Sequence, residues 1–156
     1  MRRASLWLPP LAYMAMIFYL SSQPAPLPQV TALVWDKALH FVEYGALAVL
    51  FGRALHGEGL APLRAALLAT ALASAYGATD EVHQSFVPTR ESSAYDWSAD
   101  TIGAAAAAAI FSTASHQLRR LRRSPPDRSD QPTAPAARAA RPFASDARSR
   151  RAADRE

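Results

Sequence analysis

Ionisable residues lie at the ends of the long apolar segments of this 156-residue chain and are missing from their middles. Residues 45–51, 67–75 and 104–111 form three such middles, and none of them contains a charged side chain. A helix of a soluble bundle usually spreads its charges along one stripe, because that stripe faces water over its whole length. Charged ends around charge-free middles instead favour helices that cross a membrane.

Four such helices are predicted. The first covers the apolar run 6–20, which lies in a charge-free stretch, 4–35, behind the basic start Met1-Arg2-Arg3. The other three are expected at 36–55, at 63 to about 84 and at 94 to about 116. Pro9 and Pro10 are expected in the first turn of the first helix, where a missing amide proton does little harm. The sequence therefore predicts an all-α, polytopic membrane protein with four transmembrane helices.

Two other interpretations stay open. A basic start followed by a short apolar run is also typical of a cleaved signal peptide, although no clear A-x-A cleavage site follows it. The second alternative is a soluble all-α bundle with a solvated charged face, because alanine-rich helices gain little from insertion into a membrane.

The basic residues predict an orientation, since cytoplasmic loops are enriched in lysine and arginine. On one side of the four-helix path lie Arg2, Arg3, Arg53, Arg64 and the arginines from residue 119 onward. On the other side lie Lys37 and Arg90. We therefore expect a multi-pass protein of the bacterial inner membrane, with both termini in the cytoplasm.

Residues 119–156 differ in composition from the rest of the chain. They contain eleven arginines, five acids and five of the twelve prolines. Such a segment cannot bury enough apolar surface to offset its ordering entropy. We therefore predict a membrane domain of residues 1–118 and a disordered cytoplasmic tail of residues 119–156. The tail is expected to bind the anionic inner leaflet, and no nucleic-acid binding is expected, because the positive charge belongs mainly to the tail.

The acids collect on the side opposite the arginines. In the predicted topology the second helix begins on this outer side, the third ends there and the fourth begins there. The acids near this side are Asp36, Glu43, Asp80, Glu81, Glu91, Asp96 and Asp100. His40 and Gln84 accompany them. Three helix ends therefore bring polar residues that are distant in the sequence towards one outward-facing site.

Several kinds of site are excluded. The chain has no cysteine, which excludes disulfides, thiolate nucleophiles and thiolate zinc sites. It also lacks a glycine-rich phosphate loop, a G-x-S-x-G element and an H-E-x-x-H element. No motif in the sequence requires a cofactor.

Three groups of the polar residues form a recognisable set. They are Asp36-Lys37-x-x-His40-x-x-Glu43-Tyr44, Asp80-Glu81-x-x-Gln84-x-Phe86-x-Pro88-x-Arg90 and Asp96-x-x-x-Asp100-x-x-Gly103. In this order and spacing the set resembles the VanZ-like family of small bacterial membrane proteins. The family pattern usually has asparagine where this chain has Asp100. The resemblance implies a polytopic inner-membrane protein of a family named after glycopeptide (teicoplanin) resistance, and it implies no particular reaction.

The first hypothesis for this site is an anionic lipid headgroup or a lipid-linked cell-wall precursor. Lys37 and Arg90 would hold its phosphate, with arginine the better suited to a bidentate contact. Further residues expected in the binding site are Tyr44, Glu81, Gln84 and Asp100. If the site is catalytic, the candidates for general acid–base chemistry are His40, Glu43, Asp80 and Asp96.

Two further hypotheses differ in kind. In one, a divalent metal ion is held by Asp80, His83 and Asp96, and the excess of acids over bases favours such an ion. In the other, the protein is a non-enzymatic membrane scaffold. Its polar residues then only fix the packing of the helices, while the basic tail binds the inner leaflet.

Overall fold

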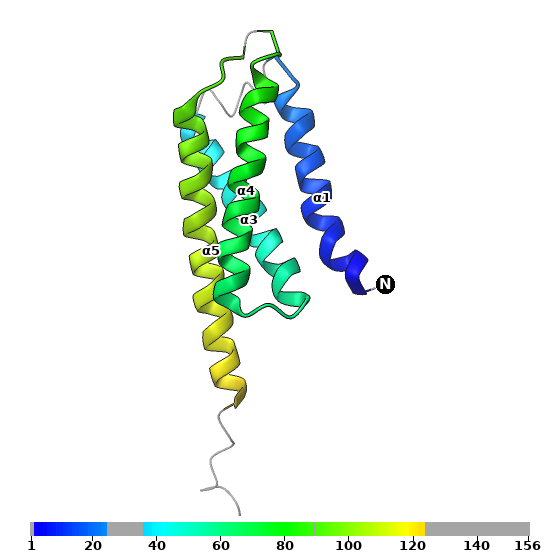
Figure 1. The fold of residues 1–156 in the computed structure, drawn as a ribbon, viewed down its shortest axis with the longest axis vertical. Helices are drawn as coiled ribbons and strands as arrows, with labels where there is room; N and C mark the ends of the chain where they lie inside the picture. The colour runs from blue at the N-terminus through cyan, green and yellow to red at the C-terminus, as the bar shows by residue number, and fades with distance from the viewer. Residues whose placement is uncertain (1, 25–35, 89, 124–156) are drawn as a thin grey trace, which may run out of the picture. The chain divides into compact units, whose positions relative to one another are not determined.

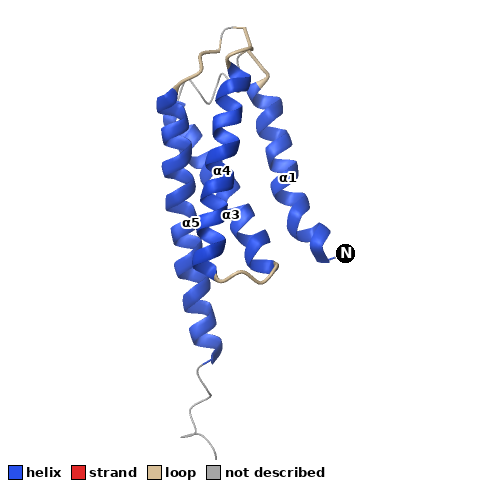
Figure 2. Cartoon of the chain, viewed as in Figure 1, coloured by secondary structure: helices blue, strands red, loops and turns tan. Residues whose placement is uncertain are grey.

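A computed structural model of the chain describes residues 2–24, 36–88 and 90–123. The regular secondary structure of these residues is entirely helical, as Figure 2 shows. The helices are α1 (Arg2–Ser21), α3 (Asp36–Gly57), α4 (Pro62–Gln84) and α5 (Ala94–Arg123). The predicted all-α fold with four helices is therefore confirmed for the described part of the chain.

The helices alternate in direction, so that their ends gather in two groups (Figure 1). Helix α1 ends, α3 begins, α4 ends and α5 begins at the end that carries Lys37, Gln84 and Asp96, which we call the polar end. The connection between α3 and α4 lies at the opposite end. It turns at Gly59, whose φ of 106° lies in the left-handed region that glycine adopts without strain.

Helix α1 begins earlier than expected, so Pro9 and Pro10 lie inside it and not in its first turn. A proline lacks the N–H that bonds to the carbonyl four residues back. The carbonyl groups of Ser5 and Leu6 therefore lose their usual donors within the helix. Arg53 of α3 replaces these donors, because its Nη2 donates to the Ser5 oxygen at 3.0 Å and to the Leu6 oxygen at 3.5 Å. The two prolines thus create an attachment point between α1 and α3.

The core between α3, α4 and α5 is built largely of small residues. Buried alanines occur at positions 48, 54, 65, 66, 69, 73, 104 and 108. Gly103 of α5 lies against the main chain of Phe41 in α3. A Cβ atom at position 103 would come within 2.8 Å of the Phe41 Cα and closer still to the Phe41 carbonyl group. The two helices therefore touch backbone to backbone, and this approach requires glycine.

Many large apolar side chains lie on the outside of these helices. They include Leu8, Leu11 and Phe18 on α1 and Leu63, Leu67 and Leu72 on α4. An alanine core beneath exposed leucine and phenylalanine is the arrangement expected of helices that pack together in lipid. By length and composition, Arg3–Ser21 and Lys37–Gly57 are each able to cross a membrane. That α4 and α5 also cross it stays a prediction.

Helix α5 is longer than predicted. It ends at Arg123 and not near His116, so residues 119–123 are helical although the sequence assigned them to the disordered tail. Leucine and arginine are good helix formers, and they extend a helix that has already started. The remaining tail, residues 124–156, falls outside the described residues, and its disorder stays a prediction.

Candidate functional site

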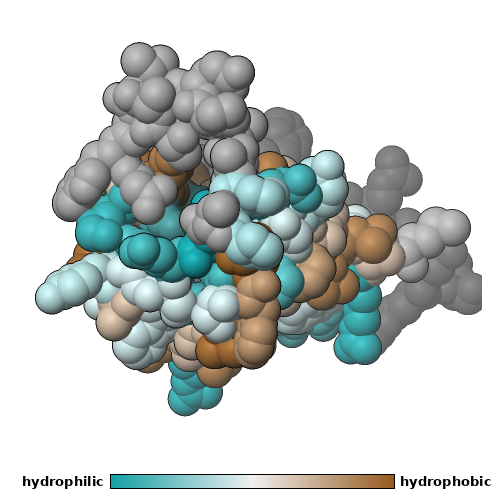
Figure 3. All heavy atoms as spheres, turned by 90° about the horizontal axis from the view of Figure 1, so that it is seen from above, coloured by the Kyte–Doolittle hydropathy of each residue, from teal (hydrophilic) through white to brown (hydrophobic). Residues whose placement is uncertain are grey.

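Three helix ends bring buried polar side chains together at the polar end. They are His40 from α3, Asp80, Glu81 and Gln84 from α4, and Asp96 and Asp100 from α5. Figure 3 looks onto this end and shows hydrophilic residues gathered on it, with hydrophobic residues along part of its edge. The arrangement follows from the alternating direction of the helices, as the topology predicted from sequence required.

His40 and Asp100 join α3 to α5. Nδ1 of His40 lies 3.0 Å from Oδ1 of Asp100, a distance at which a protonated ring nitrogen donates to the carboxylate. The Asp100 side chain is completely buried, and its second oxygen, Oδ2, has no hydrogen-bond partner among the residues that the structure describes. This oxygen faces α4, because a Cβ atom built on Gly77 would lie 2.9 Å from it. Asp100 therefore orients the imidazole with one oxygen and keeps the other unused.

The start of α5 is fixed by contacts with both neighbouring helices. Nζ of Lys37 donates to Oδ1 of Asp96 at 2.5 Å. The N–H of Ser93 donates to Oε2 of Glu81 at 2.6 Å, and Oγ of Ser93 accepts from the N–H of Asp96 at 3.4 Å. Ser93 is thus the N-cap of α5. We did not predict this role from the sequence, although serine three residues before an acid and ahead of an alanine-rich run is a cap signature.

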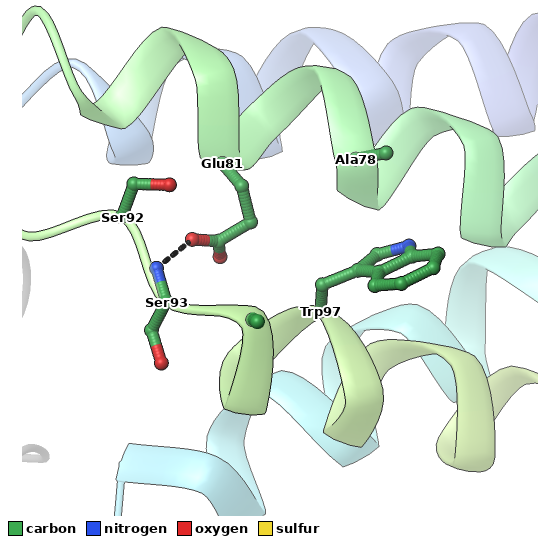
Figure 4. Close-up of a pocket in the computed structure, with 6 residues that line it drawn as sticks. Ala78, Glu81, Ser92, Ser93 and Trp97 are labelled. Carbon is green, nitrogen blue, oxygen red and sulfur yellow. Dashed lines mark hydrogen bonds between the residues drawn. The ribbon is translucent and has the colours of Figure 1, made fainter.

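Glu81 lies beside the start of α5, where it lines a cavity of about 260 Å³ (Figure 4). The other residues around this cavity are Ala78, Ser92, Ser93, Ala94 and Trp97. Trp97 crosses from α5 to α4, where its indole N–H donates to the Ser74 carbonyl at 3.0 Å. One oxygen of Glu81, Oε1, is buried and has no hydrogen-bond partner. Of the two oxygens of the Glu81 carboxylate, therefore, only Oε2 accepts a hydrogen bond among the described residues.

A second cavity, of about 360 Å³, lies at the polar end and is lined mainly by polar groups. Its lining residues are Lys37, His40, Gln84, Arg90, Glu91, Ser93 and Asp96, and we call it the polar pocket. Nε of Arg90 is buried and finds no hydrogen-bond partner within residues 2–24, 36–88 and 90–123. Gln84 is held in place by its own helix, because its Nε2 donates to Oδ2 of Asp80 at 2.9 Å. A buried guanidinium N–H without an acceptor suits an anionic oxygen.

The structure also places three further residues that the sequence predicted for the site. His83 faces α1, where its Nε2 is 3.0 Å from Oγ of Ser22 and its ring packs on Phe18 at a centroid distance of 4.4 Å. Glu43 is half-buried in α3. Tyr44 is fully buried, and its ring lies beside Gly77, the residue that Oδ2 of Asp100 also faces. The proposed acid–base and binding roles of these residues stay predictions.

The three predicted metal ligands have partners on three different helices. Asp80 accepts from Gln84 of its own helix, α4, and the ring of His83 packs on Phe18 of α1. Asp96 accepts from Lys37 of α3. A different set of three residues brings its ligand atoms within 4.8 Å of one another. Among the described residues that set is His40, Glu81 and Asp100. The sequence contained all three residues as site candidates, but their spacing along the chain did not indicate that they meet.

Comparison with curated proteins and with solved structures gave no match. The family profile described as VanZ/LLP1, in contrast, matches residues 6–115. The match runs from α1 into α5 and includes every residue around the polar pocket. Because it covers well over half of the 156 residues, and because the three polar groups resemble the same family, the chain belongs to the VanZ/LLP1 family.

Proposed function

We propose that this VanZ/LLP1 protein is a multi-pass membrane protein whose polar pocket binds the phosphate of an anionic cell-envelope lipid or of a lipid-linked cell-wall precursor. The observation that supports this proposal is the buried Nε of Arg90, which has no hydrogen-bond partner among the described residues and lies at a pocket of about 360 Å³. Guanidinium groups bind phosphate oxygens with two parallel hydrogen bonds. Lys37 lines the same pocket and adds a second positive charge, which Asp96 holds in position.

The distribution of side chains supports a membrane location. The core is rich in alanine, the large apolar residues face outward, and two helices are long and apolar enough to span a bilayer. Arg3, Arg53 and Arg64 lie at the end opposite the polar pocket. By the positive-inside rule, this end faces the cytoplasm and the polar pocket faces outward. In this proposal four helices cross the inner membrane, both termini are cytoplasmic, and the arginine-rich residues beyond α5 bind the anionic inner leaflet.

Reporter fusions test this topology. A compartment-sensitive reporter inserted at Gly59 should be active only in the cytoplasm, and one inserted at Ser92 only outside it. Placement of both positions in the same compartment would contradict the proposal. A full-length chain that stays monodisperse without detergent would support the soluble bundle instead.

Lipid retention tests the binding function. The wild-type protein and Arg90→Ala are purified in mild detergent, and the lipid extracted from each is quantified by mass spectrometry. Loss of a charge-assisted contact of about 1.5–3 kcal/mol predicts a loss of bound phosphorus-containing lipid of about tenfold or more. Arg64→Ala is the matched control, because Arg64 is exposed at the opposite end of α4 and its loss should leave retention unchanged.

The mass of the retained species separates the two sources of phosphate. A glycerophospholipid would identify a membrane lipid, and a polyprenyl-linked species would identify a precursor. Equal retention in Arg90→Ala and wild type would contradict the proposal. So would a wild-type protein that retains no lipid and binds neither class when it is added back.

The second candidate is a non-enzymatic scaffold. It is favoured by the pairs Lys37–Asp96 and His40–Asp100, because each of them ties α3 to α5. For a scaffold, a cellular phenotype should survive His40→Ala and disappear when residues 124–156 are removed. A His40→Ala protein that inserts and folds normally, yet has lost the phenotype, would exclude it.

A further inference from the structure

Next to the polar pocket, three helices contribute one potential ligand each to a common point. We propose that His40, Glu81 and Asp100 bind one divalent cation between α3, α4 and α5. The three residues are at least nine-tenths buried, with exposed fractions of 8%, 6% and 0%. Their ligand atoms lie within 4.8 Å of one another.

The spacing suits a single ion. Neighbouring ligands of a tetrahedral zinc ion lie about 3.3 Å apart, and opposite ligands of a larger, six-coordinate cation lie about 4–5 Å apart, since metal–ligand bonds are about 2.0–2.6 Å long. Adjacent ligands are closer, and the 3.0 Å between Nδ1 of His40 and Oδ1 of Asp100 is a separation of this kind. Ligand atoms within 4.8 Å of one another therefore need only small side-chain rotations to share one ion.

Two oxygens of this set have no hydrogen-bond donor in the part of the chain that the structure describes. They are Oε1 of Glu81 and Oδ2 of Asp100. Of the other two oxygens, Oε2 of Glu81 accepts from the N–H of Ser93, and Oδ1 of Asp100 lies 3.0 Å from Nδ1 of His40. A buried acceptor left without a partner destabilises a protein by about 1–3 kcal/mol, and more if it is charged. A cation bound by both carboxylates removes this penalty at two places at once.

The balance of buried charge favours a cation as well. Asp80, which precedes Glu81 in α4, is a further buried carboxylate beside Glu81 and Asp100. Of the cations at this end, Lys37 pairs with Asp96 and Arg90 lines the polar pocket. Buried carboxylates require compensation by opposite charge or by a metal. A divalent ion would neutralise Glu81 and Asp100 together.

The ligand set indicates the class of metal. Imidazole suits zinc and other first-row transition ions, whereas carboxylates also suit manganese, so one imidazole and two carboxylates favour Zn²⁺ or Mn²⁺. Three protein ligands leave a coordination position for water or for a small anion. The inference does not depend on phosphate binding in the polar pocket, although His40 belongs to both sites.

The test is metal binding by the full-length protein in detergent. The protein is stripped with a chelator and titrated separately with Zn²⁺ and with Mn²⁺ by calorimetry, and the bound metal is counted by mass spectrometry. We expect one ion per chain for at least one of the two metals. Asp100→Asn and Glu81→Gln keep the side-chain volume, remove a charged ligand, and should each weaken binding by about tenfold or more.

Matched controls separate this site from others. His83→Ala removes the imidazole that faces α1, and Glu91→Gln removes an exposed carboxylate of the polar pocket, and both should bind metal as the wild type does. Arg90→Ala should also keep its metal, so the two proposals can fail independently.

Two results would overturn the inference. One is a wild-type protein that binds neither ion more tightly than Asp100→Asn does. The other is stoichiometric binding that Glu81→Gln and Asp100→Asn leave unchanged. If one of the variants fails to fold, as judged by helical circular dichroism, the other variant and the wild-type titration still decide the question. Co²⁺ provides an independent reading, because its visible absorption should report an imidazole ligand in the wild type and change in His40→Gln.

Discussion

Replacement of Arg53 by methionine tests how α1 accommodates two internal prolines. The Arg53 guanidinium donates to the Ser5 carbonyl at 3.0 Å and to the Leu6 carbonyl at 3.5 Å, the second distance being at the limit of a hydrogen bond. A hydrogen bond from a charged donor contributes about 1.5–3 kcal/mol when buried and less when exposed, as here. We therefore expect Arg53→Met to lower the free energy of unfolding by about 1–2 kcal/mol.

The effect of Arg53→Met should depend on the presence of the two prolines. When Pro9 and Pro10 are both replaced by alanine, their new N–H groups can bond to the carbonyls four residues back. In that background Arg53 has no orphaned carbonyl to satisfy, and Arg53→Met should lower the free energy of unfolding by less than about 0.5 kcal/mol. The coupling between position 53 and the two prolines is then about 1 kcal/mol.

The assay is reversible unfolding in mixed detergent micelles, followed by the fluorescence of Trp7. This indole packs against Phe51 of α3 at a centroid distance of 6.5 Å, so its emission reports the contact between α1 and α3. Trp35 and Trp97 are replaced by phenylalanine in every sample, so that one emitter remains. An equal effect of Arg53→Met with and without the prolines would show that Arg53 does not compensate for their missing N–H groups.

Two more predictions concern the contact between α3 and α5. Gly103→Ala places a methyl group on the Phe41 carbonyl, which cannot move aside, and should destabilise the protein by about 1–3 kcal/mol in the same assay. Gly45→Ala is its control, with nearest contacts of 3.3 and 3.4 Å, and should have the smaller effect; the reverse order would contradict the packing argument. A double-mutant cycle of Lys37→Met and Asp96→Asn should give a coupling of about 1 kcal/mol or more, and additive effects would show that this part-buried pair contributes nothing.

The course of the chain could be predicted because charge marks the helix ends. Three helix limits agree closely with the structure: α3 begins at Asp36, α4 ends at Gln84 and α5 begins at Ala94. The predicted start of α1 was wrong, because we expected the two prolines to require the first turn of a helix. The sequence alone does not show that Arg53, 43 positions after Pro10, replaces the missing N–H donors. A long-range partner of this kind has no local signal.

The partners within the site could be predicted less well. Asp80 and Gln84 are one helical turn apart and do share a contact, as their spacing indicates. His83 lies on the adjoining stripe, and the position of α1 decides that it meets Ser22 and not the acids. Glu81 points towards the start of α5, where its carboxylate accepts a hydrogen bond from the N–H of Ser93. The periodicity of the sequence predicts which residues share a helix face, but only the packing of the helices decides which neighbouring helix that face contacts.

The contact between Gly103 and Phe41 has a consequence for the residues beside it. His40 precedes Phe41 in α3, and Asp100 lies one turn before Gly103 in α5. The distance between the imidazole and the carboxylate is thus set by two main chains in direct contact, and not by the volume of the side chains around them. Replacement of apolar residues elsewhere on these helices should therefore leave the geometry of the pair unchanged.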